Sequence, residues 1–134
     1  MSNPDAPATD ADRREAGTRT RREVLGDAWV DRAEAGTTPF TAGFQDLLTR
    51  VAWGEVWQRP GLGRRERSIA TLSVLLALGH WDEFALHVRA AVRNGLTEAE
   101  IAEVLQHAAV YAGVPAANHA FRVAAAVLEE LRGG

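Results

Sequence analysis

The 134-residue sequence contains no cysteine, which excludes disulfides, thiolate nucleophiles and redox-active cysteine pairs. It also contains no lysine, because all fifteen of its basic residues are arginine. Without a side-chain amine the protein cannot form a Schiff base with a substrate carbonyl or with pyridoxal phosphate. Any chemistry at carbon must therefore rely on carboxylates, imidazoles, guanidinium groups and hydroxyls.

Long apolar runs and excess positive charge are missing too. No window approaches the roughly 18 uninterrupted apolar residues of a membrane span, and the polar N-terminal stretch lacks the apolar core of a signal peptide. The formal net charge is −3, which gives no overall attraction to nucleic acid. We therefore expect a cytoplasmic protein whose partners are neither membranes nor nucleic acids.

The composition is that of a folded protein, with 46% hydrophobic and 25% charged residues. The length suits one domain. The first residues, MSNPDAPATD, are rich in Pro, Asp and Ala and have no periodicity. We therefore predict a disordered N-terminal tail over residues 1–12 and a single helical domain over residues 13–134.

Helical periodicity dominates the remainder, and no segment alternates as a strand would. The predicted helices cover residues 12–25, 27–35, 37–53, 64–78, 82–93, 97–112 and 115–132. Thr97 and Glu100 form a capping box for one of them, and Gly79, Gly95 and Gly113 mark helix ends. The expected fold class is all-α, a bundle of six or seven helices.

The segment 64–78 is the most apolar part of the chain, with apolar residues on nearly all of its faces. A helix that is apolar all round is buried. In so small a domain, burial of every face indicates a subunit contact as well as a core contact. This segment therefore predicts a homo-oligomer.

Glu83 and His87 are the best candidates for chemistry. They are four residues apart in a predicted helix, so the carboxylate and the imidazole share one face. Glu83 could fix the imidazole tautomer and raise the pKa of His87, which favours the protonated form that donates a proton. The alternative is an ordinary ion pair on a helix surface.

A metal site is the other possibility for this face, because His80, Glu83 and His87 lie at positions i, i+3 and i+7. Their spacing is not that of an HExxH motif, and three ligands on one helix rarely converge on one ion without help from another element. We therefore expect no metal.

Arg59, Arg64, Arg65 and Arg67 crowd the start of the 64–78 helix. Cations there oppose the helix dipole, so a bound anion would relieve them. Arg64 and Arg65 are interpreted as a solvated charge run, and Arg59 and Arg67 as candidates for binding carboxylates, which the planar guanidinium meets with two hydrogen bonds.

Several motifs together are similar to those of a known family. They are LGDAWVDRA (25–33), FQDLLTRVAWGEVWQRPGL (44–62), the Arg67-Ser68 pair, LHVRAAVRNGLTEAEIAEVL (86–105) and YAGVPAANHAF (111–121). The chain resembles the carboxymuconolactone decarboxylases over roughly residues 15–130. These lie in the AhpD-like superfamily, whose peroxidases carry a CxxC followed three residues later by His. Here His80 and Glu83 occupy the two cysteine positions, so disulfide-based peroxide reduction is impossible.

The resemblance implies an AhpD-like helical bundle that assembles as a ring-like homohexamer. It further implies cofactor-free decarboxylation of 4-carboxymuconolactone to the 4-oxoadipate enol-lactone, in the protocatechuate branch of the β-ketoadipate pathway. Two alternatives stay open: a non-thiol isomerase or lactone-handling enzyme with the same fold, and a catalytically silent oligomeric binding protein.

On this resemblance His87 is the general acid and Glu83 its supporting carboxylate, while Arg59 and Arg67 bind the substrate carboxylates. The further candidates for substrate binding are Glu55, Trp57, Ser68 and His119. For Trp57 the competing interpretation is core packing, and for His119 it is a core or interface histidine bonded to the backbone.

Overall fold

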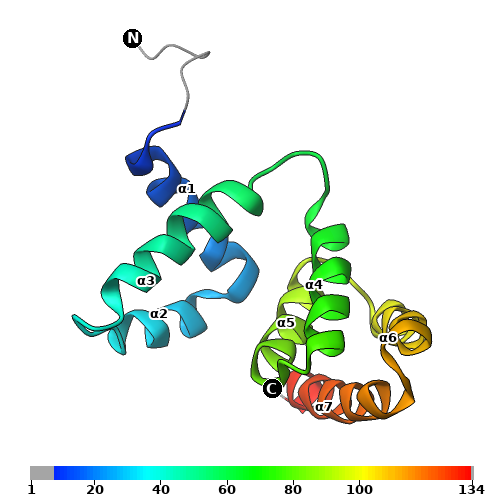
Figure 1. The fold of residues 1–134 in the computed structure, drawn as a ribbon. Helices are drawn as coiled ribbons and strands as arrows, with labels where there is room; N and C mark the ends of the chain where they lie inside the picture. Colours follow the sequence, from blue (N-terminus) through cyan, green and yellow to red (C-terminus); the bar gives the residue numbers. More distant parts are fainter. Residues whose placement is uncertain (1–7, 134) are drawn as a thin grey trace. The chain divides into compact units, whose positions relative to one another are not determined.

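The computed structural model describes residues 8–133, and over this range the fold is all-α, as predicted. Its elements are α1 (Asp10–Leu25), α2 (Asp27–Ala35), α3 (Ala42–Leu47), the π-helix η1 (Leu48–Val56), α4 (Arg64–Leu78), α5 (Trp81–Arg93), α6 (Glu98–Ala112) and α7 (Val114–Gly133). Figure 1 traces them along the chain. No strand occurs between residues 8 and 133.

The chain divides into two compact units, Met1–Gly61 and Leu62–Gly134. The first holds α1 to η1 and the second holds α4 to α7. The assignment of residues 13–134 to a single domain stays a prediction, and each unit is described here by itself.

In the N-terminal unit, helix α1 begins two residues earlier than predicted. Thr9 is its N-cap, and the Thr9 and Asp12 side chains each bond the other residue's backbone N–H in a capping box. Residues 9–12, which we assigned to the disordered tail, are therefore part of a helix start. Residues 1–7 of that predicted tail lie outside the described residues.

The predicted 37–53 helix is also different, because it begins later and changes character. A turn around Pro39, in which the Ala42 N–H bonds the Thr38 carbonyl, delays the start of α3 to Ala42. From Leu48 the helix continues as a nine-residue π-helix. This widened form is rare and occurs mostly as single-turn bulges in other proteins.

Close backbone contact between α1 and η1 accompanies this change. A Cβ added at Gly17 would lie 1.9 Å from the Thr49 carbonyl oxygen, and one at Gly54 would lie 2.1 Å from the Arg13 carbonyl oxygen. Only glycine permits so close an approach. The register of η1 thus depends on a contact with a distant part of the chain, which periodicity alone does not reveal.

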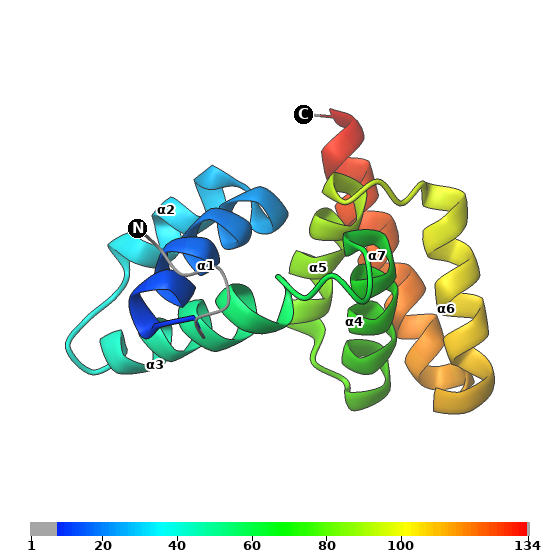
Figure 2. The ribbon, with the colours of Figure 1, turned by 90° about the horizontal axis from the view of Figure 1, so that it is seen from above.

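The C-terminal unit is a bundle of four helices around one apolar core. In Figure 2, α4 and α5 lie beside each other and α7 packs along both. The core consists of Leu72, Leu76, Phe84, Val88, Ala91, Leu96, Ile101, Leu105, Ala108, Ala120, Ala124 and Val127. These side chains come from all four helices and the loop before α6, so the unit buries a shared interior.

Helix α4 buries one face within the chain, and the expected burial of its other faces in a subunit contact stays a prediction. Ser68, Leu72 and Leu76 point into the core at intervals of four residues. Val74 and Leu78, on other faces, are 54% and 63% exposed. The chain therefore leaves a stripe of α4 uncovered.

Helix ends in this unit follow the predicted signals. Gly79, Gly95 and Gly113 all have positive φ and terminate α4, α5 and α6. Thr97 and Glu100 form the predicted capping box at the start of α6. Among the described residues, none of the helices has the length and apolar content that crossing a membrane requires.

Candidate active site

Helix α5 carries both residues of the predicted acid pair. His87 is half-buried, and its Nδ1 atom is fully buried, whereas Glu83, one turn earlier, is exposed. The strongly amphipathic sequence of α5 explains this placement, because Phe84, Val88 and Ala91 anchor its apolar face in the core. His87 flanks that face, at the boundary between core and surface.

Burial lowers the pKa of His87 to about 4, although the nearby Glu83 carboxylate opposes this change. The predicted direction of the Glu83 effect is therefore confirmed, but the expected net increase in pKa is wrong. Desolvation of the imidazolium outweighs attraction by an exposed carboxylate. The His87 ring of the free protein is therefore mostly neutral at pH 7.

Arg67 and Ser68 lie on the second turn of α4. Ser68 is completely buried, and its hydroxyl accepts a 2.8 Å hydrogen bond from Asn94 Nδ2. Ser68 thus ties α4 to the end of α5. Arg67 is half-buried, and its Nε atom is fully buried.

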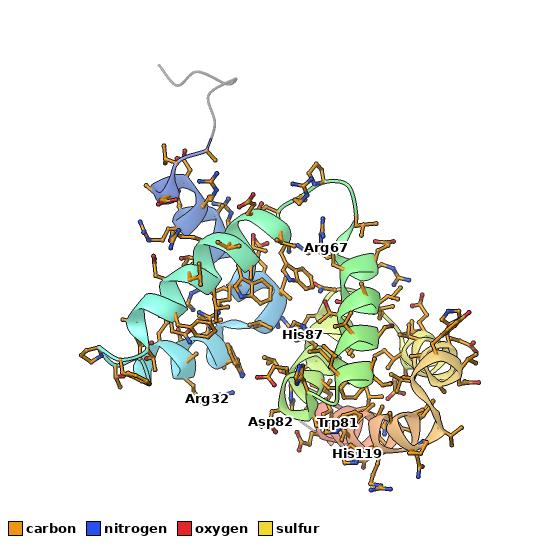
Figure 3. The ribbon with its side chains drawn as sticks, viewed as in Figure 1. Arg32, Arg67, Trp81, Asp82, His87 and His119 are labelled. Carbon is orange, nitrogen blue, oxygen red and sulfur yellow. The ribbon has the colours of Figure 1, made fainter. Side chains whose placement is uncertain are left out.

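His119 of α7 packs against Trp81 at the start of α5, with ring centroids 4.3 Å apart. Trp81 also meets Phe84 edge-on at 5.5 Å. This aromatic contact gives His119 a packing role, while its part in substrate binding stays a prediction. Figure 3 shows Trp81 and His119 close together, with Arg67 near the opposite end of α4.

The α4–α5 hairpin therefore spaces the candidate groups along its length. Ser68 bonds Asn94 at one end, and Trp81 lies at the other. His87 is six residues along α5 from Trp81, about 9 Å in rise. The C-terminal unit thus offers one half-buried imidazole and one half-buried guanidinium on adjacent helices, which suits proton transfer and carboxylate binding.

The other three candidates belong to the N-terminal unit. Glu55 is exposed, and its carboxylate lies 3.8 Å from Arg13 Nε. Trp57 stacks on Trp53 with centroids 5.2 Å apart, which supports packing as one of its roles. Arg59 is exposed in the turn that follows η1.

The arginines at the start of α4 are not all solvated as expected. Arg65 reaches the Gly95 carbonyl oxygen and the Glu100 carboxylate, and this pairing lowers the pKa of Glu100 to about 2. Arg65 therefore joins α4 to the capping box of α6. The sequence did not point to Asn94, which directly precedes the predicted helix-end residue Gly95.

No group of three or more His, Asp or Glu side chains within residues 8–133 is arranged to hold a metal ion. His80 and Glu83, two of the three considered for such a site, are exposed.

Similarity to known proteins is extensive. The sequence model of the carboxymuconolactone decarboxylase family matches residues 42–126. The 4-carboxymuconolactone decarboxylase of Acinetobacter baylyi is 45% identical over 122 residues, which are 91% of this chain and 91% of that protein. The chain belongs to the carboxymuconolactone decarboxylase family.

Two further relatives also indicate the type of reaction that this family catalyses. The nitrosuccinic acid decarboxylase of Metarhizium robertsii is 44% identical over 115 residues, covering 86% of this chain and 80% of that protein. A 4-carboxymuconolactone decarboxylase of Pseudomonas putida is 46% identical over 43 residues, covering 32% of this chain and 90% of that sequence. The named relatives are all decarboxylases, which supports the assignment of this chain to a family of carboxy-lyases.

All eight predicted site residues lie inside the segment that the family model matches. They are Glu55, Trp57, Arg59, Arg67, Ser68, Glu83, His87 and His119. The match locates them in the part of the chain that defines the family, while their individual roles stay predictions.

Proposed function

We propose that this protein decarboxylates 4-carboxymuconolactone to the 4-oxoadipate enol-lactone and carbon dioxide, without a cofactor, in the protocatechuate branch of the β-ketoadipate pathway. The observation that carries this proposal is the 45% identity to the Acinetobacter baylyi decarboxylase over 91% of both chains. A half-buried imidazole and a half-buried guanidinium on adjacent helices are compatible with it.

The substrate supplies its own electron sink in this reaction. Breaking the bond to the departing carboxylate sends the electron pair through the ring double bond to the lactone carbonyl oxygen, giving a furan-like oxyanion. The ring carbon next to that carbonyl then takes one proton. The protein must orient two carboxylates, stabilise the oxyanion and deliver the proton.

We assign proton delivery to His87, with Glu83 as its supporting carboxylate. Because the free imidazole is neutral at pH 7, we infer that it takes up a proton when the dianionic substrate binds. The negative charge of the substrate would offset the desolvation that burial imposes on the imidazolium. Glu83 alone is too exposed to achieve this.

Arg67 is our first choice for a substrate carboxylate, because a half-buried guanidinium gives stronger charge-assisted bonds than a solvated one. Arg59 is the second choice. The remaining candidates for the substrate site are Glu55, Trp57, Ser68 and His119. For Ser68 the bond from Asn94 favours a positioning role rather than direct contact.

Nitrosuccinic acid is a second candidate substrate, favoured by the 44% identity to the Metarhizium robertsii enzyme. The two acids share a chemical plan. Each carries two carboxylates, loses one of them, and has a built-in group that accepts the electron pair, a conjugated lactone in one and a nitro group in the other. A single arrangement of one acid and carboxylate-binding arginines could serve either.

The experiment mixes purified protein with 4-carboxymuconolactone or nitrosuccinate and follows ultraviolet absorbance and carbon dioxide release. We expect turnover of carboxymuconolactone, unchanged by a chelator. His87→Ala should lower kcat by about 10²–10⁴-fold while the fold is retained. His107→Ala, which removes an exposed histidine of α6, is the matched control and should keep full activity.

Four outcomes would change the assignment. Faster release of carbon dioxide from nitrosuccinate would make that acid the substrate. Conversion without carbon dioxide would favour a lactone-handling enzyme, and absence of any conversion would favour a binding protein. A His87→Ala variant as fast as the parent would remove His87 from the mechanism. The cytoplasmic location and the homohexameric assembly also stay proposals.

A further inference from the structure

Arg21 is a buried cation that has no role in the proposed reaction. It lies on α1 in the N-terminal unit and is only 6% exposed. A charge withdrawn from water to this extent is normally compensated by an opposite charge within a few ångströms. Arg21 also lies outside the segment 42–126 that the family model matches.

The two side chains that bond or stack on the Arg21 guanidinium are neutral. Its Nη2 atom donates a 3.0 Å hydrogen bond to Gln45 Oε1, and its guanidinium carbon lies 5.5 Å from the Trp29 ring centroid. Its Nε atom is buried and has no hydrogen-bond partner among the described residues. A guanidinium has five N–H donors, so Gln45 satisfies only a small part of its capacity.

The adjacent arginine has the opposite surroundings. Arg22 is more exposed, and yet it pairs with three carboxylates, those of Asp27 at 3.2 Å, Asp31 at 2.9 Å and Glu34 at 3.1 Å. Glu34 is also the acid that attracts Arg21 from a distance, but its carboxylate is bonded to Arg22. Arg21 therefore lacks a directly bonded carboxylate, whereas the half-buried Arg22 has three.

We propose that Arg21, Gln45 and Trp29 form a carboxylate-binding site in the N-terminal unit, in which a small-molecule carboxylate supplies the missing negative charge. The Nε–H group and the neighbouring Nη–H groups form a planar edge that matches the two oxygens of a carboxylate. The indole covers one face of the guanidinium, and the Gln45 amide can adjust to a second oxygen.

The site lies just below the surface. Trp29 and Gln45, which contact Arg21, are themselves only half-buried, and the proposed site requires one of these side chains to rotate so that a carboxylate can enter. Once bound, the carboxylate would be screened from water by the same side chains. A charged hydrogen bond in such surroundings is worth more than one on the surface.

Succinate is the probe, because it is a simple dicarboxylate, and succinamide at matched ionic strength is the neutral control. The first readout is the set of arginine Nε–H resonances in the NMR spectrum of the full-length protein, in which the Arg21 signal is the one that Arg21→Met removes. We expect this signal to move on addition of succinate and not on addition of succinamide.

The second readout is the affinity for succinate by calorimetry. Arg21→Met should weaken it by about 10–100-fold, the loss expected for a charged hydrogen bond. Arg19→Met, which removes the same charge from an exposed position of α1, should leave the affinity unchanged. Arg21→Lys keeps the charge without the planar edge, and should bind with intermediate affinity even if the methionine variant fails to fold.

An unmoved Arg21 signal at saturating succinate would overturn the proposal. So would equal affinities in the parent, Arg21→Met and Arg21→Lys proteins. Loss of assembly in these variants without loss of succinate binding would instead assign Arg21 to a contact between copies of the chain, and would also overturn it. Because no readout uses turnover, failure of this site and failure of the proposed decarboxylation are distinguishable.

Discussion

At the scale of single residues, the low pKa of His87 makes a direct prediction about the pH dependence of catalysis. The pH profile of kcat/KM reports the ionisation of the free enzyme, and that of kcat reports the complex. Because burial holds the pKa of free His87 at about 4, the protonated fraction falls about tenfold for each pH unit above that value. We therefore expect kcat/KM to fall with the same slope.

The kcat profile should behave differently, because substrate charge raises the pKa of His87 in the complex. We expect kcat to stay level to a clearly higher pH than kcat/KM. Steady-state rates between about pH 5 and pH 8 test this. A kcat/KM that does not change over that range would mean that the proton comes from another group.

The same burial predicts how stability depends on pH. An unfolded histidine has a pKa near 6.5, and the folded value for His87 is about 4. Between these values the unfolded chain binds more protons, so the contribution of His87 to stability is complete above pH 6.5 and is lost as the pH falls towards 4. Urea unfolding between pH 6.5 and pH 4 should show that the free energy of unfolding falls less for His87→Asn than for the parent protein as the pH is lowered.

The paired carboxylates provide an internal reference for that measurement. Hydrogen bonds from Arg14 and Arg50 lower the pKa of Asp46 to about 2. The pKa of Glu100 is also lowered to about 2. Their contributions are complete above their ordinary values and are lost only as the pH falls from about 4 towards 2. If the free energy of unfolding depended on pH between 6.5 and 4 in the same way in His87→Asn and in the parent, the assigned burial of His87 would be contradicted.

Residue identity allowed part of this site to be predicted from the sequence. The i, i+4 spacing correctly placed Glu83 and His87 on one helix and gave the sign of their interaction. It did not give the burial of His87, because burial depends on how the whole helix packs. Ser68 was similarly identified as a polar group of interest, but its bond to Asn94 joins helices that are distant in sequence.

At the scale of helices, the contact between α1 and η1 predicts unequal effects of alanine at three glycines. Alanine at Gly17 or Gly54 would place a Cβ about 2 Å from a backbone oxygen, at 1.9 Å and 2.1 Å respectively. We expect each substitution to destabilise the protein by about 1–3 kcal/mol or more, because backbone cannot rotate away as a side chain does.

Gly43 is the matched control, because a Cβ there would meet nothing within 4 Å. Gly43 lies in α3, so alanine should be neutral or should stabilise the helix by about 0.5–1 kcal/mol. Urea unfolding followed by circular dichroism compares the three variants. If Gly17→Ala were as stable as Gly43→Ala, the close approach of α1 to η1 would be wrong.

Helix ends were predictable where the signal is local. The glycines after α4, α5 and α6 and the Thr97 capping box act within a few residues, so the sequence carries the whole of each signal. The π-helix was not predictable, because its residues have ordinary helical periodicity and its register depends on Gly17, which lies more than thirty residues before Leu48.

At the scale of the whole molecule, exposed apolar side chains of the C-terminal unit predict self-association. Val74 and Leu78 of α4 are 54% and 63% exposed, and Val110 and Tyr111 of α6 are 79% and 81% exposed. Exposed apolar surface of this extent is characteristic of an interaction site. We expect sedimentation velocity to give a homo-oligomer, and the family resemblance predicts a particle six times the 14.5 kDa mass of the chain.

Val74→Glu should dissociate that particle, because burying an unpaired carboxylate in an apolar contact is costly. The matched control is Ala99→Glu, which adds the same charge at an exposed position in the first turn of α6, where the helix dipole favours it. Circular dichroism checks that both variants keep their helices. Equal sedimentation of Val74→Glu and the parent would place the contact elsewhere. A monomeric parent would instead mean that the exposed apolar stripe of α4 is not a contact between copies of the chain.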